Sequence, residues 1–211
     1  WDGRLDAPEH AKHGCLSSLK MLEEMGPLND RLEAEAKEEG RKHIPLKVGV
    51  GLNSGECVVG NMGSDQRFDY SVLGDTVNLA SRLEGQSKAY GVRIVIGEPT
   101  QKQVPMLATV ELDLIKVKGK TEAVRIFTLL GDEEMAADPH FQAFKAKVDA
   151  LLVAFRAQKW EETKALVAEA RELGKPYDID GLFDLYLERV ADYEANPPGE
   201  DWDGVFVATS K

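Results

Sequence analysis

The stretch FDYSVLGDTVNLASRLEGQSKAYG, residues Phe68–Gly91, decides the fold class because a strand pattern passes into a helix pattern within it. Phe68–Leu73 reads as a strand, and apolar residues then recur at helical spacing from about 76 to 90: Val77, Leu79, Ala80 and Leu83. Asn78 and Arg82 are four residues apart and therefore share one face of that helix. A glycine, Gly91, is expected to end the helix as its C-terminal cap.

Strand patterns flank this helix on both sides. Before it, Leu46, Val48 and Val50 alternate, a turn is expected at 53–55, and an extended run resumes at 57–59. After it, the segment VRIVI at 92–96 reads as a short buried strand. The segment 109–130 reads as two antiparallel strands joined around Gly119.

Helix patterns precede and follow these strands. A long helix is predicted for Pro8–Glu39, with a kink or an interruption at Gly26–Pro27. From about 139 to 195 the chain is almost wholly helical, and short connections predict antiparallel neighbours. We therefore expect 1–131 to form an α+β domain with helices packed on one side of its sheet. The remainder, 132–211, is expected to be a small all-α helical extension with a tail.

Aromatic residues of the predicted helical extension are interpreted as its packing face: Trp160, Phe183, Tyr186 and Tyr193. The alternative interpretation is a docking surface for a partner or a neighbouring regulatory domain. The four histidines of the chain share no metal-ligand spacing and are interpreted as structural or exposed: His10, His13, His43 and His140.

Composition narrows the function classes. Of the 211 residues, 43% are hydrophobic and 30% are charged, which is ordinary for a soluble globular protein. The formal net charge of −11 argues against general binding of nucleic acids or anionic membranes. No apolar run reaches the roughly 18 residues that a membrane span needs. Cys15 and Cys57 lack metal-ligand spacing and are expected to be reduced, buried thiols in a cytoplasmic protein.

Three segments of the chain are notable together. VGVGLNSGECVVGNMGS, residues 48–64, carries glycines that permit tight turns and close backbone approach. LGDTVNLASR, residues 73–82, carries Asn78 and Arg82, and KVKGK presents Lys116, Lys118 and Lys120 at the end of a strand. Taken singly, Arg82 would be a surface arginine paired with Glu84 or Asp75, and the lysines a solvated strand end.

These segments, together with FDYSVLGD, resemble the catalytic domain of the class III nucleotidyl cyclases, the adenylate and guanylate cyclase family. The resemblance runs from about 1 to 130, and the C-terminal helices resemble an extension found in some bacterial members. It implies a ferredoxin-like cyclase sheet with packed helices, of which the N-terminal part is missing here. It also implies a homodimer that binds the nucleotide between its two subunits.

The resemblance assigns a role to each candidate residue. Asn78 matches the residue that orients the ribose, and Arg82 the residue that stabilises charge on the reacting phosphate. Lys118 matches a triphosphate contact, for which Lys120 is a weaker candidate. Ser71 matches the position that reads the purine edge, where serine favours ATP over GTP. Cyclisation of this kind depends on positioning and on stabilising negative charge, which suits these side chains.

The family holds two Mg²⁺ or Mn²⁺ ions on two aspartates, and neither motif is present in the 211 residues. The chain starts at Trp1 and not at methionine, so we interpret it as part of a longer protein. The metal ligands, the adenine-selecting lysine, a sensor or regulatory domain, and any membrane attachment are expected upstream.

The resulting expectation is an adenylate cyclase, a phosphorus–oxygen lyase that converts ATP to cyclic AMP and pyrophosphate in signalling. The fragment by itself is expected to be inactive. Two alternatives stay open, namely a guanylate cyclase and a non-catalytic cyclase-like module that binds a nucleotide or a partner.

Overall fold

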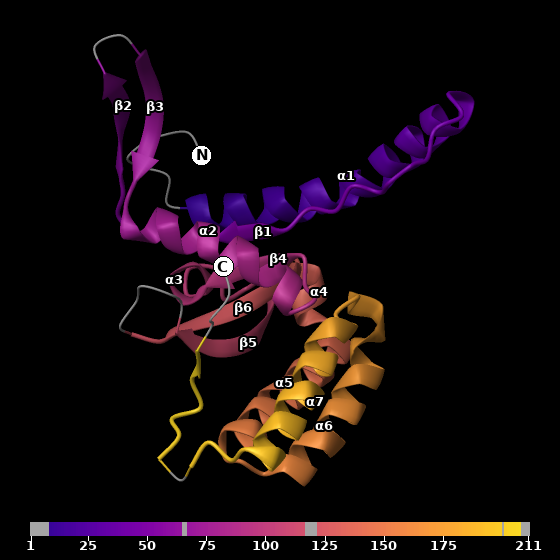
Figure 1. The fold of residues 1–211 in the computed structure, drawn as a ribbon, viewed down its shortest axis with the longest axis vertical. Helices are drawn as coiled ribbons and strands as arrows, with labels where there is room; N and C mark the ends of the chain where they lie inside the picture. Colours follow the sequence, from indigo (N-terminus) through magenta and orange to yellow (C-terminus); the bar gives the residue numbers. More distant parts are fainter. Residues whose placement is uncertain (1–8, 65–66, 117–121, 200, 208–211) are drawn as a thin grey trace.

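The computed structural model describes residues 9–64, 67–116, 122–199 and 201–207. A sheet of five strands has the order β1 (Val50–Leu52), β4 (Ile94–Gly97), β6 (Val124–Gly131), β5 (Ala108–Lys116) and β7 (Phe206–Val207). The outer pairs β1–β4 and β5–β7 are parallel, and the inner pairs are antiparallel. A separate antiparallel hairpin consists of β2 (Val58–Ser64) and β3 (Arg67–Leu73), and it projects away from the sheet (Figure 1). The mixed α+β fold predicted from the sequence is confirmed.

The helices occur in two groups along the chain. The first group accompanies the sheet strands: α1 (His10–Glu38), α2 (Asp75–Ala89) and the short α3 (Glu98–Gln101). The second group follows the last antiparallel strand: α4 (Glu133–Ala137), α5 (Pro139–Arg156), α6 (Trp160–Gly174), the 3₁₀ turn η1 (Lys175–Tyr177) and α7 (Asp180–Ala195). In Figure 1 the helices α5, α6 and α7 lie side by side below the sheet, which agrees with the predicted helical extension.

Both faces of the sheet are covered by helices, and this corrects the expectation of helices on one side. Ile94 and Ile96 of β4 pack with α1, whereas Val95, between them, packs on the opposite face with α2 and the C-terminal helices. Successive side chains of a strand point to opposite faces, so β4 contributes to both cores. Every residue of β4, with the sequence IVIG, is buried and none is charged, which is typical of a strand covered on both faces.

Helix α2 lies directly on strand β1 because the strand is glycine-rich. A Cβ atom on Gly51 would be 2.2 Å from the backbone oxygen of Ala80, closer than any side chain permits. Leu79 and Leu83 of α2 point toward the sheet and are buried. The expected close backbone approach within 48–64 is therefore present at Gly51.

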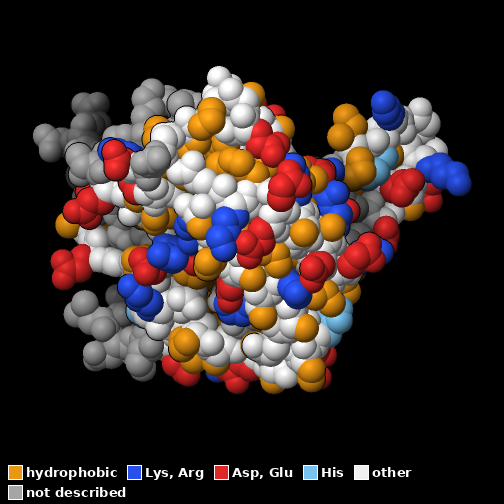
Figure 2. Space-filling model, turned by 90° about the horizontal axis from the view of Figure 1, so that it is seen from below, with side chains coloured by type: hydrophobic (Ala, Val, Ile, Leu, Met, Phe, Trp, Pro, Cys, Tyr) orange, Lys and Arg blue, Asp and Glu red, His pale blue; other side chains and the backbone are white. Residues whose placement is uncertain are grey.

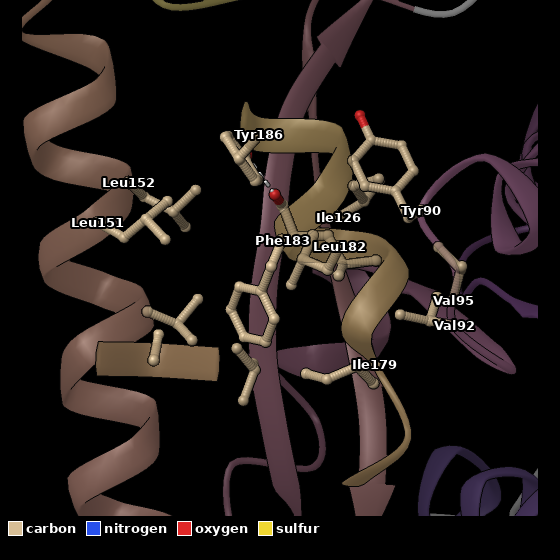
Figure 3. Packing of buried hydrophobic residues seen from close by; sticks show 14 of the residues in the cluster. Tyr90, Val92, Val95, Ile126, Leu151, Leu152, Ile179, Leu182, Phe183 and Tyr186 are labelled. Atoms are coloured by element: carbon tan, nitrogen blue, oxygen red, sulfur yellow. Dashed lines mark hydrogen bonds between the residues drawn. The ribbon is translucent and has the colours of Figure 1, made fainter. Parts of the chain in front are cut away.

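The C-terminal helices share a core with the sheet. Phe144, Phe155, Phe183 and Tyr186 are buried in the same hydrophobic cluster as Val110 and Ile126 of the sheet, while Trp160 and Tyr193 pack against it half-buried. Figure 3 shows Leu182 of α7, and Ile179 just before this helix, near Val92 and Val95. The aromatic residues predicted to form a packing face do form one. The division at 131 and 132 remains a prediction, because the two parts pack as neighbours across one core.

Two local expectations are wrong, and a third is narrowed. β1 begins at Val50, because Asn29 of α1 holds the preceding segment through two hydrogen bonds with the backbone of Leu46, at 2.7 and 3.0 Å. α1 continues through Pro27, so the interruption does not occur and the kink stays a prediction. Cys57 is exposed, whereas Cys15 is buried, and both thiols are free.

The surface carries both signs of charge. On the face shown in Figure 2, acidic and basic side chains are interspersed with hydrophobic ones. Such a face does not present the concentrated cations that attract a polyanion. Within the described ranges, no helix has both the length and the apolar character that crossing a bilayer requires.

Candidate functional site

The polar pair predicted from the sequence lies on the outer face of α2. Asn78 and Arg82 are both exposed, one turn apart, while Leu79 and Leu83 on a neighbouring face of the helix are buried in the core. Among the described residues no ion pair joins Arg82 to Glu84, one of the two acidic partners considered for a purely structural role. The structure thus brings the amide and the guanidinium together and leaves both facing outward.

The start of α2 is fixed by its neighbours. The backbone oxygen of Gly74 accepts hydrogen bonds from the amides of Val77 and Asn78, both at 3.1 Å. The side-chain amide of Asn53 donates to the hydroxyl of Thr76 at 2.7 Å and to its backbone oxygen at 3.2 Å. These bonds tie the loop after β1 to the first turn of the helix. Asn53 was read from the sequence only as part of a turn.

Ser71 lies in β3, opposite Gly60 of β2, and is half-buried. It borders an open hollow of about 480 Å³ between the hairpin, the start of α1 and α2. The α2 residues that line this hollow are Thr76, Val77 and Ala80. Asn78 and Arg82 lie on the other side of the helix, so a single chain does not place all three predicted residues around one hollow.

Lys118, the predicted triphosphate contact, lies outside the described residues, as does Lys120. The strand that leads to them is well defined. Lys116, the last residue of β5, is exposed and pairs with Val207 of β7. The roles of both lysines therefore stay predictions from the sequence.

A buried polar cluster lies at the other end of α2. Tyr90, the residue after the helix, donates from its hydroxyl to Oδ2 of Asp113 on β5 at 2.6 Å. Arg189 of α7 donates to the same carboxylate oxygen at 2.6 Å and to the Tyr90 hydroxyl at 3.1 Å. Burial, and next the Asp113 carboxylate, raise the pKa of Tyr90, so its phenol stays protonated. The three side chains form a closed triangle.

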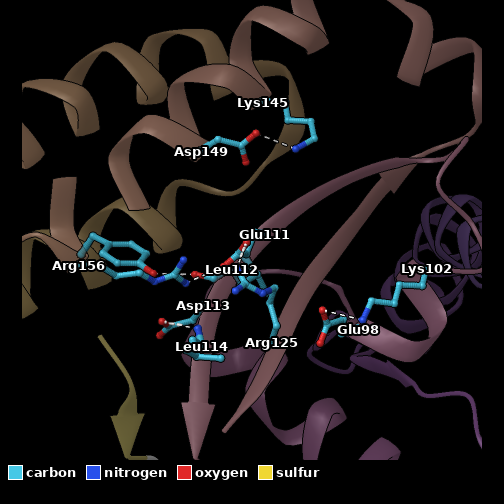
Figure 4. A network of polar contacts seen from close by, with 11 residues as sticks. Glu98, Lys102, Glu111, Leu112, Asp113, Leu114, Arg125, Lys145, Asp149 and Arg156 are labelled. Carbon is cyan, nitrogen blue, oxygen red and sulfur yellow. Dashed lines mark hydrogen bonds and ion pairs between the residues drawn. The ribbon is translucent and has the colours of Figure 1, made fainter. Parts of the chain in front are cut away.

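A second cluster joins the sheet to α5. Glu111 of β5 accepts two hydrogen bonds from Arg125 of β6, both at 2.7 Å, and one from Arg156 of α5 at 2.6 Å (Figure 4). The hydrogen bond to Glu111 is the main cause that raises the pKa of Arg125. The glutamate lies between two cations and holds the sheet and the helix together.

Sequence reasoning did not single out Arg189 or Asp113, although a signal was present. Arg189 lies on the apolar stripe of its helix, at helical spacing from Leu182 and Tyr186, and Asp113 lies between two leucines of a strand. A charged residue in such a position requires a buried partner. The sequence did not indicate which residue that partner is, because 76 positions separate the two.

The described residues contain no group of three His, Cys, Asp or Glu side chains placed to hold one metal ion.

The part of the chain that carries these residues is similar to known proteins. A family model described as the adenylate and guanylate cyclase catalytic domain matches residues 5–131. Adenylate cyclase 1 of Rhizobium meliloti is 32% identical over 132 residues, which cover 62% of this chain and 19% of that protein. The match spans 24% of the length of the adenylate cyclase of Anabaena cylindrica, so the chain corresponds to a small part of either relative.

Two solved structures are similar in fold. The adenylyl cyclase CyaB from P. aeruginosa superposes with a TM-score of 0.52 at 29% identity, over 62% of this chain and 64% of that one. The guanylyl cyclase Cya2 superposes with a TM-score of 0.51 at 25% identity, over 63% and 64%. The similarity thus extends to proteins named for either purine nucleotide.

Proposed function

Because the chain belongs to the family of adenylate and guanylate cyclase catalytic domains, we propose that it is the C-terminal part of an adenylate cyclase domain that converts ATP to cyclic AMP and pyrophosphate. The observation that carries this proposal is the exposed pair Asn78 and Arg82 on one face of α2, inside the region that matches the family. Guanylate cyclase activity is the second candidate, since the guanylyl cyclase Cya2 shares the fold.

Each residue of the site has a defined task in the proposed reaction. The ribose 3′-oxygen attacks the α-phosphorus, and the bond from this phosphorus to the pyrophosphate oxygen breaks. Arg82 donates two parallel hydrogen bonds to the phosphoryl oxygens as negative charge develops. Asn78 holds the ribose, Ser71 reads the adenine edge, and Lys118 binds the leaving pyrophosphate as a point charge.

The position of the pair favours a site shared by two copies of the chain. Both side chains face outward, and the hollow beside Ser71 opens on another side of α2. On the projecting hairpin, Val58 and Leu73 are paired across the strands and are 67% and 59% exposed. Apolar side chains that are exposed together are typical of an interface. We propose that a homodimer covers the hairpin and completes the nucleotide site.

The divalent ions expected for this reaction would supply charge neutralisation at the phosphates and activation of the 3′-hydroxyl. We propose that their ligands and the adenine-selecting lysine lie outside this sequence, with an upstream sensor. On this proposal the 211-residue chain alone is inactive, and the full-length protein is the species to assay.

The proposal is tested by incubating the full-length protein with ATP or GTP in Mg²⁺ or Mn²⁺ and measuring both cyclic nucleotides. We expect cyclic AMP from ATP and much less cyclic GMP from GTP. A preference for GTP would establish the second candidate. Tight nucleotide binding without turnover under every condition would contradict a cyclase and indicate a regulatory module.

Arg82→Ala in the full-length protein tests the site itself. We expect kcat to fall about 100- to 1000-fold, because a donor to the transition state is lost, while KM for ATP changes only a few-fold. Lys88→Ala is the matched control, since it removes an exposed cation from the last turn of the same helix. Equal losses in kcat and in ATP affinity would mean that Arg82 only binds the substrate.

A further inference from the structure

Helix α7 of the C-terminal extension contacts the end of the helix that carries the proposed catalytic pair. Its Arg189 donates to Asp113 and to the hydroxyl of Tyr90, and Tyr90 is the first residue after α2. The Tyr90 hydroxyl accepts from Arg189 and donates to Asp113, so its position is determined by two partners at once. The end of α2 is thereby bonded both to the sheet and to α7.

This triangle is enclosed on every side. Arg189 is 6% exposed and Asp113 is 1% exposed. The second oxygen of Asp113, Oδ1, accepts from the amide of Leu114 at 2.7 Å. The guanidinium carbon of Arg189 lies 3.6 Å from the centre of the Phe206 ring, which belongs to β7. Burial shields this ion pair from water, and hydrogen bonds in such surroundings are stronger than in water.

A second contact joins the same two helices. A Cβ atom built on Gly181, in the first turn of α7, would lie 2.8 Å from the Cα atom of Gly91, so the two backbones touch. Close to it, Ile179 and Leu182 pack on Val92 and Val95 in the shared core (Figure 3). α7 therefore contacts the turn after α2 with its first residues and the end of α2 with its later ones.

We propose that Arg189 and Tyr90 are positioning residues, through which α7 fixes the direction of α2 and thus the placement of Asn78 and Arg82. The inference rests on the proposed function of that pair. Tyr90 follows Arg82 by eight residues, a rise of about 12 Å along a rigid helix. A small tilt at one end is therefore transmitted to the other, and a displacement of about 1 Å at a reacting group can cost about 100-fold in rate.

A purely stabilising role explains the cluster less well. Replacing a buried ion pair with apolar residues of similar volume is often neutral or favourable for stability, because desolvation of the two charges offsets their attraction. What the hydrogen-bonded triangle adds is one defined orientation of its members. The helical extension would then hold α2 in one orientation, and this effect of the Arg189–Tyr90 contact on α2 is called the brace.

The test uses two variants of the full-length protein that each remove one buried hydroxyl. Tyr90→Phe breaks the link to α2 and leaves the Arg189–Asp113 ion pair in place. Tyr186→Phe is the matched control, because the hydroxyl of Tyr186 on α7 donates its hydrogen bond to the backbone oxygen of Leu112 on β5 and not to Tyr90. Both are assayed well below the lower of their melting temperatures.

We expect Tyr90→Phe to lower kcat about three- to tenfold with KM for ATP within about twofold of the wild type. Amide hydrogen exchange over the second half of α2 should become faster in this variant. Tyr186→Phe should leave kcat within about twofold of the wild type and the exchange of α2 unchanged. Equal kcat losses in the two variants would overturn the proposal and leave only a loss of stability.

Failure of the brace and failure of the proposed function give different results. If the wild type makes cyclic nucleotide and Tyr90→Phe matches it in kcat, the brace is wrong and the function stands. If the wild type makes none, the function is wrong. The exchange measurement then still decides whether α7 fixes α2, and unchanged exchange in Tyr90→Phe overturns that link.

Discussion

The two cysteine side chains differ in reactivity because their surroundings differ. Burial raises the pKa of the Cys15 thiol to about 11, whereas Cys57 is exposed. The thiolate is the reactive form, and at pH 8 about one part in a thousand of Cys15 would be ionised. We expect the folded chain to react rapidly with one equivalent of a thiol reagent and with the second only in denaturant.

Cys57→Ser is the control for this titration. It should remove the rapid reaction and leave the slow one, because Cys15 lies on the buried face of α1, in one cluster with Ile94 and Ile96. Two rapid equivalents in the wild type would mean that α1 does not cover this face of the sheet.

Single residues also show which features of the site could be predicted from the sequence. The shared helix face of Asn78 and Arg82 was predicted from their spacing, because such a face depends only on local periodicity, whereas their proposed roles came from the family resemblance. Arg189 was not predicted as a site residue, because its importance arises from Asp113 and Tyr90, which are distant in sequence. The local sequence pattern predicts which side chains share a face of one helix or strand. Polar clusters between two or more elements become visible only in the tertiary structure.

Glycine at the end of α2 allows a close contact between two elements. Gly91 has a φ of +63°, and a Cβ atom on it would lie 2.6 Å from the Cα atom of Gly181. We expect Gly91→Ala to lower the free energy of unfolding by about 2 kcal/mol or more, since it adds left-handed strain to a backbone clash. The midpoint of urea unfolding measures this change.

Gly85 of the same helix is the matched control. No atom lies within 4 Å of a Cβ atom at this position, and its backbone is helical. Gly85→Ala should raise the free energy of unfolding by about 0.5–1 kcal/mol. A Gly91→Ala variant as stable as the wild type would show that α7 does not approach the end of α2 so closely.

Elements with strong periodicity were predicted well, and elements that depend on distant contacts were not. α2, the strand at 94–97 and the helical extension follow from apolar spacing alone. The alternation of Leu46 and Val48 did not yield a strand, because Asn29 binds the backbone there instead. α1 runs through Pro27 although proline removes one backbone hydrogen bond, and Asn29 holds the helix beyond it.

The sheet and the C-terminal helices share one hydrophobic cluster, and two polar clusters cross the boundary between them. The family match ends at 131, yet the apolar side chains of β5 that face the helices would be exposed without them. Loss of the bundle would therefore destabilise the sheet, since apolar burial contributes about 25 cal/mol per Å². A common core predicts that both parts unfold together.

Two probes at opposite sides of the molecule test this expectation. In a chain with Trp1→Phe and Cys57→Ser, tryptophan fluorescence reports only on Trp160 and Trp202. These two rings lie in one aromatic cluster with Phe155 of the helical bundle. Labelling of Cys15 reports the release of α1 from the sheet. We expect both signals to change at the same urea concentration, because the clusters around Glu111 and Asp113 bind the bundle to β5. A fluorescence change that precedes the labelling of Cys15 would show two independently unfolding domains, and α7 could then not hold α2 in place.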